Sequence, residues 1–138
     1  DLLPFAANAD LPWLMTSHIL YPAWDRARPA TLSPIIIEHV IRGRLGFRGV
    51  LVSDDLAMHA LTGPPAARAT AAIEAGCDLA LYCPADAEGT AAVLRAVPPL
   101  TDLAQARMAA ARATAAARRI ALDEPVLAAE RARLVPGA

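Results

Sequence analysis

Residues 50–56 read VLVSDDL, an apolar run that stops abruptly at Ser53, Asp54 and Asp55. A short β-branched run of this kind predicts a buried strand, here over residues 49–53. The two carboxylates therefore stand at the carboxyl end of that strand. In parallel α/β sheets the functional side chains gather at this end of the strands. The stretch thus predicts both the fold class and the place of a site.

Two further apolar runs predict strands before and after this one. Residues 11–17, LPWLMTS, lead into His18, and residues 78–83, DLALYC, lead into Pro84. Apolar character along the whole run predicts burial on both faces, so we expect Trp13 to pack in the core. The carboxyl ends of all three strands should meet at one edge of the sheet.

Helices are predicted between and after these strands. Ser33 followed by Pro34 is typical of an N-cap with proline at the first helical position, and Gly46 should end that helix over residues 35–45 in a left-handed conformation. Further helices are expected over residues 66–76, 87–96, 101–122 and 125–134. The last two make residues 101–138 an Ala/Arg-rich helical tail.

The alternation of strands and helices predicts an α/β fold with parallel strands joined by right-handed crossovers. A complete eightfold barrel takes about 200 to 400 residues, so 138 residues can form only part of one. A small open doubly wound sheet is the alternative that this pattern leaves open. We expect residues 1–138 to form a partial single domain.

Composition restricts the partners. The 13 basic residues are all arginine and face 14 acidic residues, for a formal net charge of −1. This balance favours small or neutral ligands and predicts no binding to nucleic acid or to a membrane. The N-terminus lacks the pattern of a signal peptide, and the absence of an initiator Met leads us to expect a piece of a longer protein. Cys77 and Cys83 are expected to be buried thiols, which fits a reducing cytoplasm.

The Asp pair is the first candidate for chemistry. A carboxylate held at the end of a buried strand suits a nucleophile or a general base. Adjacent residues on an extended strand point opposite ways, so we expect one Asp to enter a pocket and the other to cap the following turn. The alternative is that both only cap the turn or pair with arginine.

Histidines and aromatic residues supply further candidates. His18 could contact a polar substrate or carry protons, or it could simply bond to the backbone, whereas His39 should be solvated on its helix. His59 stays open because it follows the Asp pair closely in the chain. Tyr21 and Trp24 could line a pocket for a sugar or another ring. Metal-ligand spacings, phosphate loops and nucleophile elbows are absent from the sequence, and we expect no metal and no cofactor.

Four segments in order resemble the family 3 glycoside hydrolases, and among these the bacterial β-N-acetylhexosaminidases of cell-wall recycling. They are LMTSHILYPAWD, RPATLSP, GRLGFRGVLVSDDLAMHAL and EAGCDLALYC. The resemblance implies a (β/α)8 TIM-type barrel, of which this chain would supply the last three βα units. The missing N-terminal part of the same enzyme would then be its first partner.

The resemblance also implies roles for single residues. Asp54 matches the family's nucleophile, which forms a covalent glycosyl-enzyme and retains the anomeric configuration. Asp55 would be its structural neighbour. His18, Met58 and His59 match positions near the pocket and are expected to line the substrate site.

The family's proton donor, an Asp–His pair after a KHFPGHG-like segment, has no match in this chain. We therefore expect the full protein to be a cytoplasmic enzyme that releases N-acetylglucosamine from muropeptides, and the chain alone to be inactive and to self-associate. An inert fragment or a sugar-binding pseudo-enzyme is the alternative. A metal-binding receiver-like module is a further one, although it would require another Asp or a Lys at a strand end.

Overall fold

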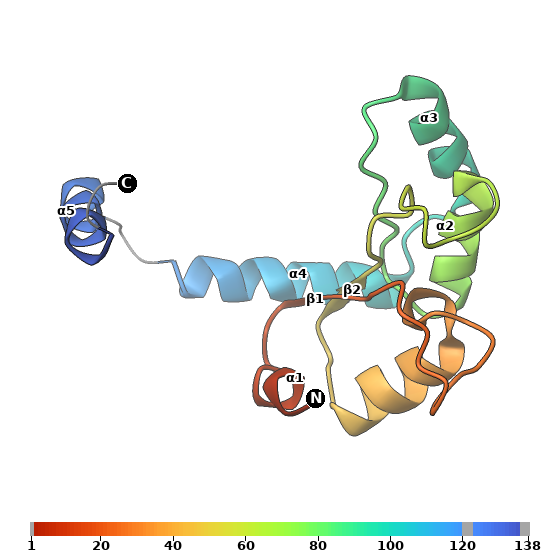
Figure 1. Ribbon diagram of the computed structural model, residues 1–138, viewed down its shortest axis with the longest axis horizontal. Coiled ribbons are helices and arrows are strands. Elements are labelled where there is room, and N and C mark those ends of the chain that lie inside the picture. The colour runs from red at the N-terminus through yellow and green to blue at the C-terminus, as the bar shows by residue number, and fades with distance from the viewer. Residues whose placement is uncertain (1, 120–122, 136–138) are drawn as a thin grey trace.

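Two short parallel strands pair at the centre of the structure, a computed structural model that describes residues 2–119 and 123–135 (Figure 1). Strand β1 (Trp13–Met15) lies beside β2 (Val50–Val52), with Leu14 opposite Leu51. Both strands lie within the predicted ranges and are shorter than predicted. Their parallel pairing, with helices between and after them, is the predicted α/β fold class.

The predicted third strand is present only as a single bridge, which corrects the expectation of a regular strand over residues 78–83. Leu79 forms a parallel bridge with Val52 on the side of β2 away from β1. Beyond it, the backbone N–H of Leu81 donates to Ser53 Oγ at 2.8 Å, and the N–H of Cys83 donates to Asp55 Oδ1 at 3.1 Å. Side-chain oxygens thus replace the carbonyl groups that a regular ladder would use.

Helices account for most of the remaining structure. Their bounds are α1 (Leu3–Ala7), the 3₁₀ turn η1 (Ala30–Leu32), η2 (Ile36–Arg44), α2 (Pro65–Glu74), α3 (Ala87–Ala96), α4 (Asp102–Ala117) and α5 (Glu124–Leu134). Helix α3 has the predicted bounds, whereas α1 was not predicted. Helix α4 ends earlier than predicted, because no residue after Ala111 in it is buried and packing no longer supports the helix.

The helix after Pro34 confirms its predicted ends and differs in its pitch. Ser33 Oγ accepts from the N–H of Ile36 at 3.1 Å, and Gly46 has the predicted positive φ of 71°. Its interior is a π-helix rather than the predicted α-helix. Gly43 suits this wider turn, since an added Cβ would lie 3.1 Å from the carbonyl oxygen of Glu38.

Gly49 allows β2 to enter beside the chain that leads into β1. A Cβ at this position would lie 2.5 Å from the carbonyl oxygen of Pro12, a distance that no side chain tolerates. The backbones can therefore approach, and the N–H of Val50 donates to the same Pro12 oxygen at 2.9 Å. Any larger residue at position 49 would push the two strands apart.

The core lies between β2, η2 and α2, and it includes residues of α3 and α4. Its largest fully buried hydrophobic side chains are Phe47, Val50, Leu51 and Leu56. Trp13 was predicted to belong to this core but is 43% exposed. Within the described residues β1 is an edge strand, and Trp13 and Met15 share the face that nothing covers, whereas Leu14 packs against the core from the other face.

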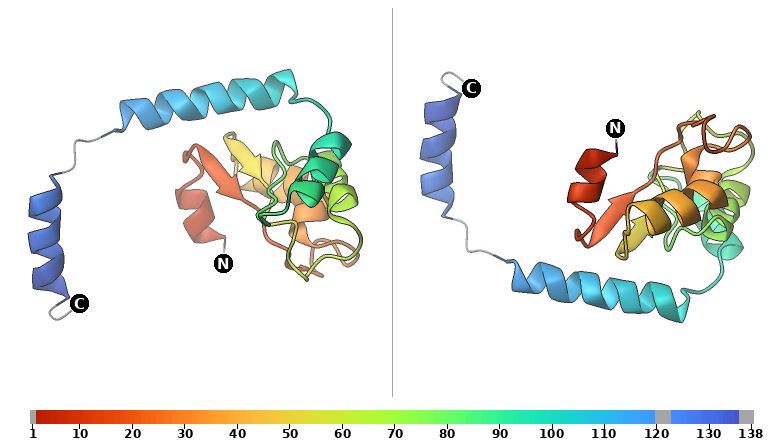
Figure 2. Two further views of the ribbon diagram at one scale, coloured as in Figure 1. Left: turned by 90° about the horizontal axis from the view of Figure 1, so that it is seen from above. Right: turned by 90° about the horizontal axis from the view of Figure 1, so that it is seen from below.

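Helices α2 and α3 pack side by side, and α4 passes the sheet near β2 before it extends away from it (Figures 1 and 2). Helix α5 lies apart from the other elements in both figures and contains no buried residue. Among the described residues, no helix combines the length and the apolar character that crossing a membrane requires.

A buried ionic network joins four segments at Asp78. This residue begins the bridge segment, residues 78–81, which contains the Leu79 bridge to β2. Asp78 Oδ2 accepts from Arg42 Nη2 at 2.8 Å and from the N–H of Leu51 at 2.9 Å, while Asp78 Oδ1 accepts from Arg107 Nη1 at 2.7 Å. The Asp78 side chain is only 6% exposed. Burial lowers the pKa of Arg42, and the neighbouring charge of Arg107 lowers it further. One carboxylate therefore ties η2, β2 and α4 together.

Replacing Asp78 with Asn should destabilise the fold by about 3 to 5 kcal/mol, because two largely buried guanidinium groups would lose their counter-ion. Urea unfolding at pH 7 measures this change. The matched control is Asp10→Asn, which breaks the exposed pair between Asp10 and Arg118 and should cost less than about 1 kcal/mol. Equal losses in the two variants would contradict the importance of the network.

Candidate active site

The backbone after β2 is held by the bridge segment. The N–H of Ser53 donates to the carbonyl oxygen of Leu79 at 3.0 Å, and the N–H of Leu56 donates to that of Leu81 at 2.9 Å. Ser53 is fully buried, and its hydroxyl accepts from the N–H of Leu81. The two residues between Ser53 and Leu56 are Asp54 and Asp55, so the Asp pair lies on a segment that is fixed at both ends.

Asp55 is the residue that caps the turn. Its Oδ1 accepts from the N–H of Ala57 at 3.0 Å and from the N–H of Cys83 at 3.1 Å. The hydrogen bond from Ala57 is the main reason why the pKa of Asp55 lies below its ordinary value, and the bond from Cys83 adds to it. The Asp55 side chain is therefore committed to holding the backbone.

Asp54 has a different environment, as the alternation along the strand predicted. Its Oδ1 accepts from the N–H of Asp55 at 2.8 Å, and its side chain is half-buried. No other side chain among the described residues makes a hydrogen bond or an ion pair with this carboxylate. Asp54 thus presents a carboxylate on a rigid backbone with an oxygen that remains available to a ligand.

His18 is brought to the Asp pair by the end of β1. Its Nε2 lies 2.9 Å from the carbonyl oxygen of Asp55, and its Nδ1 lies 2.9 Å from Thr31 Oγ1. Both ring nitrogens are therefore engaged with the protein. This arrangement matches the backbone-bonded interpretation of His18 and leaves no ring nitrogen free to carry protons to a substrate.

Met58 and His59 lie on the exposed loop that follows Asp55. The N–H of Met58 donates to the carbonyl oxygen of Asp55 at 3.1 Å, and its side chain is 44% exposed. His59 is exposed and makes no hydrogen bond to another described residue. The structure thus joins His18 to the Asp pair but brings neither of these two side chains into contact with Asp54.

Arg68 was missed by the sequence reasoning, although it organises this loop. From α2 its Nη1 donates to the carbonyl oxygens of Leu56 at 2.7 Å and Met58 at 3.2 Å. The one available signal was an arginine within an otherwise Ala- and Thr-rich helical stretch.

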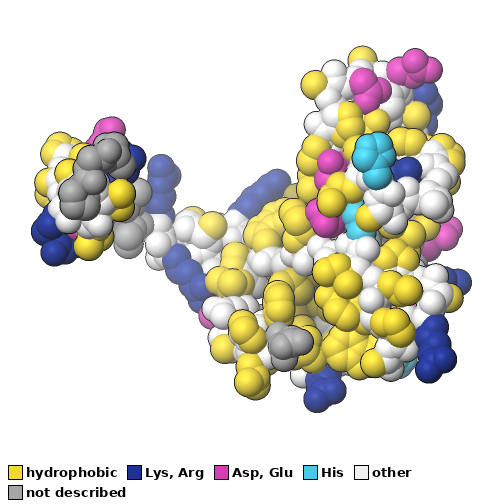
Figure 3. All heavy atoms as spheres, viewed as in Figure 1, with side chains coloured by type: hydrophobic (Ala, Val, Ile, Leu, Met, Phe, Trp, Pro, Cys, Tyr) yellow, Lys and Arg dark blue, Asp and Glu magenta, His cyan; other side chains and the backbone are white. Residues whose placement is uncertain are grey.

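Acidic and histidine side chains lie close together on one part of the surface in Figure 3, above a region where hydrophobic side chains predominate.

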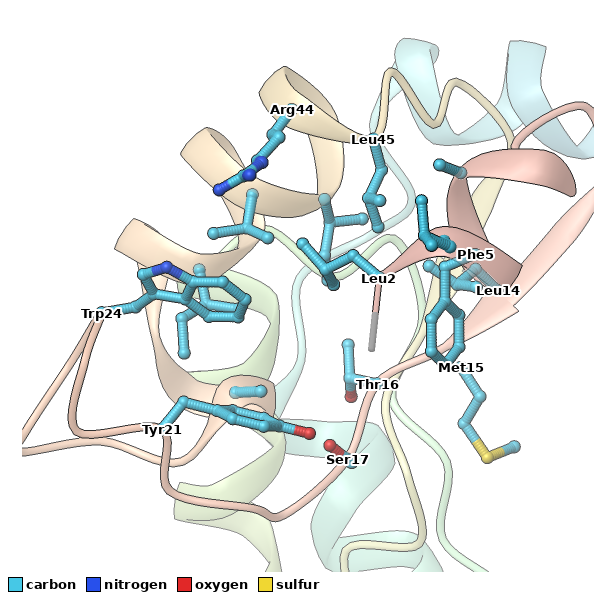
Figure 4. A pocket seen from close by; sticks show the side chains of 16 residues that line it. Leu2, Phe5, Leu14, Met15, Thr16, Ser17, Tyr21, Trp24, Arg44 and Leu45 are labelled. Atoms are coloured by element: carbon cyan, nitrogen blue, oxygen red, sulfur yellow. The ribbon is translucent and has the colours of Figure 1, made fainter.

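Tyr21 and Trp24 line a hollow of about 650 Å³ that is distinct from the Asp pair. Their ring centroids are 5.7 Å apart, and in Figure 4 they face Phe5 and Met15 across the hollow. Most of its other lining side chains are aliphatic and come from η2 and the N-terminal segment. Asp54 is not among the lining residues. The predicted aromatic pocket therefore exists as an apolar hollow beside β1, away from the carboxylates.

The two cysteines differ, which corrects the expectation that both are buried. Cys77 is buried, and desolvation raises its pKa to about 12. Cys83 is exposed because it follows the bridge segment, where the chain leaves the core. The pKa of Cys83 is raised mainly by desolvation and also by the nearby charge of Asp55.

These features define a site for carboxylate chemistry. The segment after β2 carries two carboxylates: Asp55 caps the turn, and Asp54 accepts only from the N–H of Asp55 among the described residues. A carboxylate held rigidly at the end of a parallel strand is expected for an enzyme that uses a fixed nucleophile or base. Within residues 2–119 and 123–135, no group of three potential ligands could hold a metal ion.

Residues 1–121 match the family model described as the glycosyl hydrolase family 3 N-terminal domain. The chain belongs to this family. Two relatives named beta-hexosaminidase, from Alkalilimnicola ehrlichii and Chromobacterium violaceum, are 45% and 44% identical over 78% and 76% of the chain. The chain spans 32% and 30% of their lengths, about a third of each.

Solved structures give the same relationship. The chain resembles a glycoside hydrolase family 3 beta-N-acetylglucosaminidase from Paenibacillus sp. with a TM-score of 0.73 and 32% identity, over 89% of this chain and 27% of that one. A beta-N-acetylhexosaminidase from Beutenbergia cavernae is also 32% identical, with a TM-score of 0.58 over 79% of this chain and 36% of that one.

Asp55→Asn should make unfolding less dependent on acid. A carboxyl whose pKa is lowered by folding stabilises the protein above its unfolded pKa of about 3.9, and this contribution is lost as the pH falls through the lower folded value. The variant should therefore be less stable than the parent at pH 7, and the two should converge below about pH 4. Urea midpoints between pH 7 and pH 2.5 test this, and a constant difference would contradict it.

One thiol per folded chain should react with a disulfide reagent at pH 8. Cys83 is exposed but has a raised pKa, so it should react more slowly than a free thiol, and Cys77 should react only after unfolding. Counting released thiolate in buffer and in urea measures both, with Cys83→Ser as the matched control. Rapid labelling of Cys77 in the folded protein would contradict its burial.

Proposed function

We propose that this chain is the C-terminal part of the (β/α)8-type barrel of a retaining β-N-acetylhexosaminidase, with Asp54 as its nucleophile. The observation that carries the proposal is the Asp54 carboxylate itself: it stands at the carboxyl end of a parallel strand, on a fixed backbone, with an oxygen available to substrate. The relatives named beta-hexosaminidase support the reaction class.

The partial barrel is supported by the uncovered edge of β1. Trp13 and Met15 are exposed there, and Met15 also lines the apolar hollow. A closed barrel would pair that edge with a preceding strand and bury these side chains. The relatives are about three times longer than this chain and have enough additional residues to supply such strands.

The reaction would proceed in two displacements. Asp54 attacks the anomeric carbon as the glycosidic bond breaks, and the sugar becomes covalently attached to a carboxylate oxygen. Water then hydrolyses this ester, so that the released sugar keeps its original configuration. We assign the role to Asp54 rather than Asp55, because Asp55 Oδ1 accepts from the N–H groups of both Ala57 and Cys83 and so holds this side chain to the backbone.

The acid that protonates the leaving group would come from outside this chain. His18 is the histidine bonded to the Asp pair, and both of its nitrogens are already bonded. General acid assistance is worth about 10² to 10⁴ in rate. The isolated chain should therefore be inactive toward unactivated glycosides, and its exposed edge favours self-association.

The substrate we propose is a muropeptide with a terminal N-acetylglucosamine, met in the cytoplasm during recycling of the cell wall. This choice rests on the sequence segments that resemble the recycling enzymes and on the similarity to relatives named beta-hexosaminidase. His18 would support the segment that carries the nucleophile, because it bonds the carbonyl oxygen of Asp55. Met58 and His59 lie on the exposed loop after the Asp pair and are free to approach a bound sugar.

Asp54→Asn in the full-length protein should lower kcat for an aryl N-acetylglucosaminide by at least about 10⁴-fold, because an amide cannot form the glycosyl ester. The Asn side chain keeps an oxygen that can accept from the N–H of Asp55, so folding should be preserved. Release of the phenol measures turnover. Asp10→Asn, an exposed carboxylate away from the strand ends, is the matched control. Activity of the Asp54 variant near that of the control would rule out Asp54 as nucleophile.

A further inference from the structure

The segment that carries the Asp pair is connected to the rest of the site by a chain of side-chain hydrogen bonds. The N–H of Asp54 donates to Thr16 Oγ1 at 3.2 Å, and Thr16 Oγ1 lies 2.8 Å from Thr31 Oγ1. Thr31 Oγ1 lies 2.9 Å from His18 Nδ1, and His18 Nε2 lies 2.9 Å from the carbonyl oxygen of Asp55. The chain leaves the dipeptide at one end and returns to it at the other.

When His18 is neutral, the two ends of this chain fix the direction of every bond in it. A backbone N–H can only donate and a carbonyl can only accept, so Thr16 accepts from Asp54 and His18 Nε2 must carry a hydrogen. In a neutral imidazole Nδ1 is then an acceptor, which requires Thr31 to donate to it. Thr31 has one hydrogen, so its oxygen receives the hydrogen of Thr16.

All three side-chain hydrogens are satisfied by this single arrangement. Each of them has one acceptor, and both hydroxyl groups are shielded: Thr31 is fully buried and Thr16 is 7% exposed. The N–H of Thr31 also donates to the carbonyl oxygen of Ser17 at 3.1 Å, which brings the buried hydroxyl to the end of β1. A buried polar network in which every member has a partner favours one geometry over its alternatives.

We infer that His18, Thr31 and Thr16 form a one-directional hydrogen-bond relay that holds Asp54 in position for attack, with His18 locked as its neutral Nε2–H tautomer. These are positioning residues, since none of them reaches the available oxygen of Asp54. The inference rests on the proposed function, because it assigns the relay to the attacking carboxylate. It gives the histidine a role other than lining the substrate pocket.

Thr31→Val tests the relay, since valine keeps the shape of threonine and removes the hydroxyl. In the full-length protein kcat should fall about 10- to 100-fold, as expected when a reacting group is slightly misplaced, while KM for an aryl N-acetylglucosaminide stays nearly constant. Thr31→Ser is the matched control, because it restores the hydroxyl and should restore most of kcat. Equal kcat values for the two variants would overturn the relay.

The tautomer gives a second measurement that depends neither on activity nor on the folding of Thr31→Val. In full-length protein with ¹⁵N-labelled histidine at pH 8, the His18 ring should show a protonated Nε2 and an unprotonated Nδ1, with the signal assigned by its loss in His18→Gln. A proton on Nδ1, or an average of both tautomers, would overturn the inference.

The two failures can be told apart. Full activity of Asp54→Asn would remove the proposed nucleophile and leave the tautomer result standing as a structural fact. If Asp54→Asn is inactive while Thr31→Val matches Thr31→Ser, the proposed function survives and the relay is rejected. A loss of folding in Thr31→Val, seen by circular dichroism, transfers the decision to the tautomer measurement.

Discussion

The carboxylate of Asp78 is the contact on which the arrangement of the chain depends. It lies between Arg42 of η2 and Arg107 of α4 and also accepts from the N–H of Leu51 in β2. A buried charge is costly unless it is paired and hydrogen-bonded, and here each partner comes from a different element. The packing of the two helices against the strand therefore pairs both arginine charges and satisfies the N–H of Leu51. A shift of any one element would leave one of these three groups without its partner.

The two carboxylate groups of the sheet have opposite tasks. Asp78 stands at the start of the bridge segment and is paired with two arginines, whereas Asp54 lies two residues after the end of β2 and has an available oxygen. Parallel α/β folds commonly separate stability and chemistry in this way, with function at the carboxyl ends of the strands. Asp55 lies between the two extremes: it is placed beside Asp54 but used as a backbone cap.

The parts of the fold that depend on neighbours in sequence could be predicted, whereas those that depend on distant partners could not. The N-cap at Ser33, the left-handed Gly46 and the capping of the turn by one Asp of the pair follow from local rules. The relay joins Thr16 to Thr31, which is 15 positions away, and to Asp54, which is 38 positions away. No periodicity in the sequence predicts contacts over these distances. The prediction of a regular third strand was wrong for the same reason. The N–H groups of Leu81 and Cys83 donate to side-chain oxygens of Ser53 and Asp55 rather than to carbonyl groups. Trp13 was predicted to lie in the core because it is apolar. It is exposed because the described residues include no layer that covers this side chain.

The segment that carries the Asp pair is nevertheless fixed by partners within the described residues of this chain. The hydrogen bonds found for residues 53–56 all come from partners between positions 16 and 83. The uncovered face of β1 contributes none of the N–H donors that fix the Asp55 carboxylate. A layer that covered that face would bury Trp13 and Met15 and exclude water. The hydrogen bonds that fix residues 53–56 require no partner from such a layer.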